Sequence, residues 1–237
     1  ALAPQFKRLG YGVDFWYGGV PSWDGMNRLA LAQGFDHFYG YPDYHAPKQT
    51  TWGTDDEHLF AALYDHLASE DPTVHVVMTV SNHPPYTIDV ASLGYDLEQA
   101  KRITHEMPDV DNPDQLALEV GHIWYMDKIV TDFVKKTEAQ YPYSLFIITG
   151  DHAVRTNPSN HPTMYEHDAV PFVIYGAGVT KDILPPNAIG GCTSILPTLM
   201  ELIAPAGFEY CSILPSMTEG QQTASFNTNI WITDKAV

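Results

Sequence analysis

Two polar residues, Asp151 and His152, follow the apolar run 145–149 after one glycine, Gly150. A carboxylate and an imidazole side by side can supply an oxygen and a nitrogen ligand to one divalent cation. In the alternative interpretation, Asp151 caps the next turn and His152 is a surface histidine. A position after a buried strand favours a ligand site, because ligands of parallel α/β sheets bind at the carboxyl ends of the strands. Both interpretations stay open at this point.

A third polar residue, His83, follows another apolar run in the stretch SNHPPYT, residues 81–87. The two prolines after His83 restrict the backbone, so the imidazole has little freedom. Such a histidine can donate a hydrogen bond to a phosphoryl or sulfuryl oxygen, or protonate a leaving alkoxide. An ordinary turn histidine is the alternative.

Trp23 and Arg28 lie in YGGVPSWDGMNRLALAQGFDHFYG, residues 17–40. An indole presents an apolar face to a glycerol or sugar group, and a guanidinium is a natural bidentate partner of phosphate. Arg28 also opens a helical segment, where it is equally explained as a solvated side chain. These two residues are therefore candidates for substrate binding and carry little weight on their own.

A polar cluster follows in NHPTMYEHDAVPF, residues 160–172. Its candidate metal ligands are His161, Glu166, His167 and Asp168. These residue types could form a second metal half-site. In an acidic chain, however, such a cluster is more often a polar loop, and we expect a loop here.

The composition excludes some classes of partner. Twelve basic against 29 acidic residues give the 237-residue chain a formal charge of −17, with no basic patch, so nucleic acid is not expected as a ligand. No stretch approaches the roughly 20 apolar residues of a membrane span. Cys192 and Cys211 are consistent with one disulfide or with two buried thiols, and neither is near enough to a predicted histidine to be proposed as a nucleophile.

The candidate residues lie among alternating strand and helix patterns. Apolar runs predict buried strands at 13–17, 75–80, 145–149 and 170–175, and helical spacing of apolar residues predicts helices at 55–70, 113–140 and 193–204. This alternation predicts an α/β fold with a mainly parallel sheet flanked by helices on both faces. Polar stretches at 41–54 and 84–113 are expected to run over the edge of the sheet at which the strands end and the candidate site residues lie. The chain opens in a helix pattern that leads into a strand, so we expect the domain to be incomplete at its N-terminus.

Taken in order, six stretches resemble the sulfatase-like branch of the alkaline phosphatase superfamily. They are GYGVDFWYGG, SWDGMNRLALAQGFDHFYG, SNHPPYTI, FIITGDHA, VPFVIYGAG and SILPTLMELIAP. Within that branch they are most similar to the lipoteichoic acid synthase and phosphoglycerol transferase group. The resemblance covers nearly the whole chain, and SNHPPYT and TGDHA are its most specific parts.

The resemblance implies an extracytoplasmic catalytic domain, usually carried on membrane helices, that transfers phosphoglycerol from a lipid or hydrolyses a phosphate or sulfate ester. The family nucleophile is a threonine, and its metal is held by that threonine, a glutamate and an Asp-His pair. Asp151 and His152 match the Asp-His pair, and His83 matches the histidine that binds the substrate phosphate. Trp23 and Arg28 fall in the Trp-x-Arg region, although four residues rather than one separate them.

On this basis we expect residues 1–237 to be the C-terminal portion of one catalytic domain, with the threonine and the glutamate upstream of Ala1. The chain alone should then be nearly inactive. We expect manganese as the divalent ion, with magnesium, calcium or zinc as alternatives, and a lipid-derived or other phosphate or sulfate ester as the substrate. The sequence indicates neither the natural ester nor the oligomeric state.

Two other functions remain open. An arylsulfatase-type hydrolase shares the fold, and its Cys-x-Pro-x-Arg motif, absent from this chain, would also lie upstream. A non-catalytic binding module that retains the fold is the alternative outside the enzymes.

Overall fold

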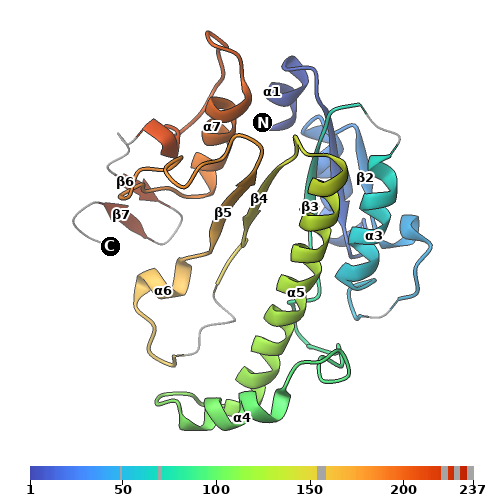
Figure 1. Cartoon of the computed structure of the whole chain (residues 1–237), viewed down its shortest axis with the longest axis vertical. Helices are drawn as coiled ribbons and strands as arrows, with labels where there is room; N and C mark the ends of the chain where they lie inside the picture. The colour runs from blue at the N-terminus through green and yellow to red at the C-terminus, as the bar shows by residue number, and fades with distance from the viewer. Residues whose placement is uncertain (49, 69–70, 154–158, 220–223, 227–229, 234–237) are drawn as a thin grey trace. The chain divides into compact units, whose positions relative to one another are not determined.

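The computed structural model describes residues 1–48, 50–68, 71–153, 159–219, 224–226 and 230–233 (Figure 1). The chain divides into two compact units, each described by itself. Unit 1 comprises Ala1–Pro142 and Pro158–Asn160, and unit 2 comprises Tyr143–Asn157 and His161–Val237.

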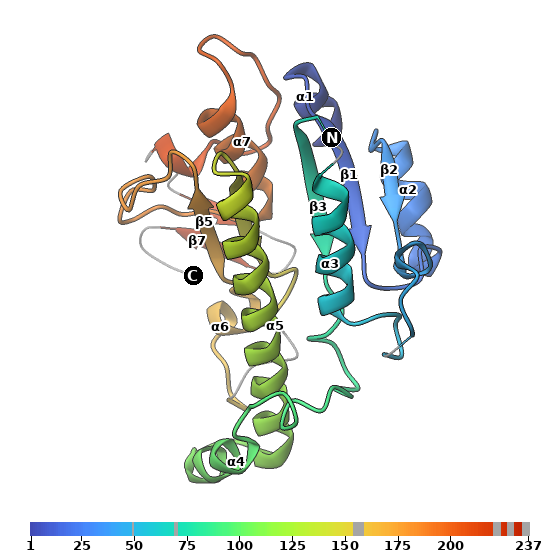
Figure 2. The same cartoon turned by 45° about the vertical axis from the view of Figure 1, so that its right-hand side comes forward.

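Unit 1 is built on a parallel sheet. Its central strand β1 (Gly12–Tyr17) pairs with β2 (His37–Tyr39) on one side and β3 (Thr73–Met78) on the other. The helices are α1 (Ala3–Arg8), α2 (Met26–Ala32), α3 (Asp56–Leu67), α4 (Leu97–Glu106) and α5 (Pro113–Gln140), and there are 3-10 turns η1 (Trp23–Gly25) and η2 (Tyr41–Tyr44). The predicted α/β class, with a parallel sheet flanked by helices, is confirmed (Figure 2).

The two faces of this sheet are covered differently. Successive residues of a strand point to opposite faces, so Trp16 and Phe15 lie on different sides of β1. Trp16 belongs to the main core cluster, where Leu59 and Leu63 of α3 and Tyr125 of α5 are buried with it. Phe15 stacks on the Phe38 ring at 5.1 Å and meets the edge of Phe35 just after α2. The main hydrophobic core therefore lies between the sheet and the helices α3 and α5.

Helix α5 begins and ends at the predicted residues. The side chain of Asn112 accepts a hydrogen bond from the Gln115 N–H, and Pro113 occupies the first helical position, where its missing N–H costs nothing. No helix in the described part of the chain combines the length and the apolar character needed to cross a membrane.

Unit 2 contains two short two-stranded sheets. Strand β4 (Leu145–Thr149) pairs with β5 (Phe172–Gly176), and β6 (Ala224–Phe226) pairs with β7 (Trp231–Thr233). The helical elements are α6 (Met164–Asp168), α7 (Cys192–Ile203) and η3 (Met217–Glu219). Both strand pairs are antiparallel, so the expectation of parallel strands holds for β1, β2 and β3 but not for β4 and β5. Apolar runs cannot distinguish the two arrangements when both strands are covered.

Several other features differ from the sequence expectation. Strands β2, β6 and β7 have three residues each, too few for a recognisable pattern. The stretch 84–113 contains helix α4, whose sequence is mostly polar. Cys192 and Cys211 are both exposed, and the structure shows no disulfide between them.

Candidate functional site

The predicted substrate residues of unit 1 lie near the carboxyl ends of its parallel strands. β1 is followed by Gly18 and Gly19, and β3 leads through residues 79–82 to His83. A bridge between Gly19 and Gly53 brings a later segment against the end of β1. The approach is so close that a Cβ on Gly53 would lie 2.2 Å from the Gly18 carbonyl oxygen. Glycine is therefore required there, and its neighbour Trp52 is carried to the same strand end.

His83 packs against Trp52. Their ring centroids are 4.4 Å apart and the rings are inclined at 74°, an edge contact. His83 Nδ1 lies 2.9 Å from the Pro84 carbonyl oxygen, and Trp52 Nε1 donates to the same oxygen at 2.8 Å. Since a carbonyl only accepts hydrogen bonds, Nδ1 carries the proton, and Nε2 is the acceptor nitrogen of the neutral ring.

Trp23 also contacts Trp52. The Trp23 and Trp52 rings meet edge to face at 5.9 Å, and the Tyr17 ring lies 6.3 Å from Trp23. Trp23 remains 45% exposed. Trp23 and His83 thus both contact Trp52, and the arrangement can offer an apolar surface beside an imidazole. Sequence reasoning missed Trp52, whose only signal was an indole in an otherwise polar loop.

Arg28 is exposed on α2, close to the turn that carries Trp23. Gly25 between them has φ +68°, a conformation that glycine adopts readily, and it precedes the first residue of α2. A Cβ on Gly25 would lie 3.3 Å from a guanidinium nitrogen of Arg28. The guanidinium therefore folds back toward the Trp23 turn, where it can meet an anion from solution.

Asp151 and His152 lie in unit 2, just after β4. Their side chains are 69% and 46% exposed, and Asp151 Oδ2 lies 3.7 Å from His152 Nε2. The backbone N–H of His152 donates a hydrogen bond to Asp151 Oδ1 at 2.9 Å. Metal–oxygen and metal–nitrogen distances are about 2.1 Å, so two atoms at this separation can share one ion. Asp151 and His152 could therefore supply two ligands on one side of a metal ion.

The pair does not form a larger ligand cluster within the chain as described. Among the described residues, no group of three or more His, Cys, Asp or Glu side chains is placed to hold a metal ion. The polar cluster at 160–172 instead caps a helix: Thr163 and Glu166 form a reciprocal capping box at the start of α6. His167 Nδ1 lies 3.5 Å from Asp168 Oδ2. The stretch expected to be a loop therefore contains a short helix, and Thr163 and Glu166 cap that helix.

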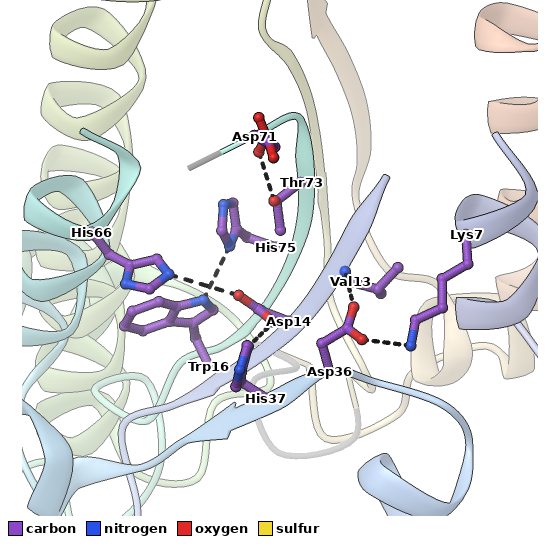
Figure 3. A network of polar contacts seen from close by, with 10 residues as sticks. All are labelled: Lys7, Val13, Asp14, Trp16, Asp36, His37, His66, Asp71, Thr73 and His75. Carbon is purple, nitrogen blue, oxygen red and sulfur yellow. Dashed lines mark hydrogen bonds and ion pairs between the residues drawn. The ribbon is translucent and has the colours of Figure 1, made fainter. Parts of the chain in front are cut away.

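A polar network within the parallel sheet was not predicted (Figure 3). The buried carboxylate of Asp14 on β1 lies 3.0 Å from His37 Nδ1 on β2 and 3.7 Å from His66 Nε2 on α3. Nearby, Trp16 Nε1 donates to His75 Nδ1 on β3 at 3.1 Å. Burial lowers the pKa of His75 to about 4. The network gives the buried Asp14 side chain polar partners in mid-strand, away from the strand ends.

The comparison with known proteins defines the class. The Sulfatase family matches residues 1–204, and the chain belongs to that family. This match includes all five residues predicted for the site. No curated protein sequence matches the chain.

Solved structures agree with the fold. The lipoteichoic acid synthase LtaP from Listeria monocytogenes superposes with a TM-score of 0.70 at 19% identity, over 92% of this chain and 54% of that one. A protein in the alkaline phosphatase superfamily from Vibrio parahaemolyticus superposes with a TM-score of 0.60 at 24% identity, over 84% of this chain and 46% of that one. The Streptococcus pyogenes phosphoglycerol transferase GacH, solved with sn-glycerol-1-phosphate, superposes with a TM-score of 0.50 at 16% identity. The superposition covers 71% of this chain and 44% of that one. The chain spans about half the length of these structures, and identities this low establish the fold alone.

Proposed function

We propose that this chain is part of a metal-dependent enzyme that transfers phosphoglycerol from a lipid-derived ester, or hydrolyses a related phosphate ester. The observation that carries the proposal is the gathering of Trp23 and His83 around Trp52 at the ends of parallel strands. It is supported by membership of the Sulfatase family and by the similarity in fold to GacH, which binds sn-glycerol-1-phosphate.

His83 acts on the ester group. With the proton held on Nδ1 by the Pro84 carbonyl, Nε2 is the nitrogen that can take up a proton. The protonated ring then donates from Nε2 to a phosphoryl oxygen or to the leaving alkoxide. The Trp23 and Trp52 rings receive the glycerol part of the substrate, and Arg28 pairs with its phosphate.

Asp151 and His152 hold one side of a divalent ion, which we propose is manganese. Such an ion supplies charge neutralisation at the transferring group and lowers the pKa of a bound nucleophile. The threonine nucleophile and the glutamate ligand belong to a segment that precedes Ala1. We further propose that the parent protein is anchored to a membrane and acts on its extracytoplasmic side.

The experiment compares turnover of a phosphoglycerol diester and of an aryl sulfate by the full-length protein, with and without His83→Ala. We expect turnover of the diester that falls at least about 100-fold in the variant, the scale of a lost general acid. The metal content should be unchanged, since His83 is not proposed as a ligand.

Other outcomes select the alternatives. Preferential hydrolysis of the sulfate would support an arylsulfatase-type enzyme. Turnover of neither ester, together with no bound metal, would favour the binding module. Robust diester turnover by residues 1–237 alone would contradict the proposal that the nucleophile lies upstream.

A further inference from the structure

Residues 52–56 link the ends of two strands of unit 1, and we call them the linking segment. The Thr54 N–H donates to the Gly18 carbonyl oxygen at 3.0 Å, and Gly53 bridges to Gly19, so the segment is bonded to the end of β1. Its last residue, Asp56, is the first residue of α3 and is completely buried. The segment therefore has little freedom to move relative to the sheet.

Asp56 bonds this segment to the turn after β3. Its Oδ1 accepts the Val80 N–H at 2.9 Å, and its Oδ2 accepts the Ser81 N–H at 3.0 Å. In return, the Asp56 N–H donates to Ser81 Oγ at 3.0 Å. The His83 N–H closes the same turn by donating to the Val80 carbonyl at 3.2 Å. One carboxylate thus fixes two consecutive backbone groups of the turn that presents His83.

Trp52 acts at the other end of that turn. Its indole N–H holds the Pro84 carbonyl, the same group that accepts the Nδ1 proton of His83. The edge contact between the Trp52 and His83 rings limits rotation of the imidazole. Trp52 therefore orients both the ring and the acceptor that selects its tautomer.

We propose that Asp56 and Trp52 are positioning residues that hold His83 in the Nδ1–H tautomer, with Nε2 as the reactive nitrogen. Neither residue is assigned contact with the reacting atoms. The proposal rests on the proposed function for the role of His83 toward the ester, whereas the tautomer itself does not depend on any substrate. Asp56 is suited to this task because a carboxylate has two acceptor oxygens for two N–H groups, whereas an asparagine has one.

The direct test is nitrogen–proton correlation spectroscopy of the histidine ring in the wild-type chain and in two variants. Trp52→Phe keeps an aromatic ring but removes the indole donor, and Asp56→Asn removes one acceptor. We expect a single Nδ1–H tautomer for His83 in the wild type and a mixture with the Nε2–H tautomer in each variant. Matched controls are Trp124→Phe in α5 and Asp96→Asn, whose carboxylate caps α4 through the Gln99 N–H.

Thermal unfolding of each variant shows whether it is folded. If Asp56→Asn does not fold, the tautomer of His83 in Trp52→Phe tests the positioning role, since this variant preserves most of the packing. A folded variant in which His83 stays wholly Nδ1–H would overturn the role of the residue changed. An equal change in the controls would also overturn it, because the effect would not come from the linking segment.

A kinetic test separates this proposal from the proposed function. In the full-length protein, Trp52→Phe should lower kcat for the phosphate diester roughly 10- to 100-fold through misplacement of His83, with the metal content unchanged. A change in KM alone would report only the contact of Trp52 with the glycerol group. Loss of metal in this variant would contradict a role limited to His83. If His83→Ala itself retains turnover, the proposed function fails at this residue, whereas the tautomer measurement still decides the positioning role.

Discussion

His83 in unit 1 and the pair Asp151 and His152 in unit 2 all follow strands, yet they are held differently. His83 has its ring nitrogen, its ring edge and its turn fixed by other residues. The side chains of Asp151 and His152 lie against each other, and both are substantially exposed. The difference suggests two arrangements: an imidazole that is preorganised before substrate binds, and a ligand pair that an ion and further ligands would order.

The strongest contrast between the two regions is expected in their response to pH. Burial lowers the pKa of His75 to about 4, so the native state binds this proton less tightly than the unfolded chain does. The stability from neutral His75 is complete above about pH 6.5 and is lost as the pH falls toward 4. Relative to His75→Gln, which keeps an acceptor for Trp16, the wild type should lose roughly 3 kcal/mol between pH 7 and 4. Chemical denaturation across this range measures it.

The contribution of Asp56 to stability should depend on pH in the opposite direction. Burial raises the pKa of this carboxyl to about 6, so the native state binds the proton more tightly than the unfolded chain. The stability that comes from this tighter proton binding is complete below about pH 3.9 and is lost as the pH rises through 6. Compared with Asp56→Asn, the wild type should lose roughly 2 to 3 kcal/mol as the pH rises from 4 to 7.

The exposed pair in unit 2 supplies a control for the size of these effects. Asp151→Asn should change the free energy of unfolding by no more than about 0.5 kcal/mol, because this side chain is largely exposed. Chemical denaturation measures it, and a larger loss of stability in Asp151→Asn than in His75→Gln or Asp56→Asn would reverse the comparison.

Substrate binding gives a smaller effect. Trp23→Ala should weaken binding of sn-glycerol-1-phosphate about tenfold, because it removes one apolar face of the cluster around Trp52. Trp231 on β7, which is 66% exposed, provides the matched control, and Trp231→Ala should bind as the wild type does. Calorimetry on the full-length protein measures both, and equal affinities in the two variants would remove Trp23 from the site.

The smallest effect is expected at the polar cluster in unit 2. Thr163→Ala removes the side-chain cap of α6 and should cost about 1 kcal/mol in the free energy of unfolding, without loss of metal. Elemental analysis beside thermal unfolding checks both parts. Metal loss in this variant would mean that the region contributes to a metal site after all.

Local signals explain which elements the sequence predicts well. Helix α5 is predicted to the residue because Asn112 and Pro113 mark its start and apolar residues recur at helical spacing over 28 residues. Strand β2 has no such signal, since its three residues are recognised only by pairing with β1. The antiparallel pairing of β4 with β5 likewise depends on contacts between distant segments.

In the candidate site, too, some residues are predictable from local sequence signals and others are not. His83 and Trp23 are identified from motifs, and the structure places them around one indole. Trp52 and Asp56 could not be identified, because a tryptophan in a polar loop and an acidic residue in a first helical turn have ordinary local explanations. Their roles arise from hydrogen bonds to residues 80–84, which no local pattern indicates.

The most direct test of the account is a calorimetric manganese titration of the full-length protein and its Asp151→Ala variant, with elemental analysis of both. His83→Ala serves as the control that should keep its metal. We predict one manganese ion per wild-type chain and an affinity at least about 100-fold lower in Asp151→Ala, since even outer-shell changes cost 10- to 100-fold. Unchanged metal content in Asp151→Ala would contradict the assignment of Asp151 and His152 to a metal site.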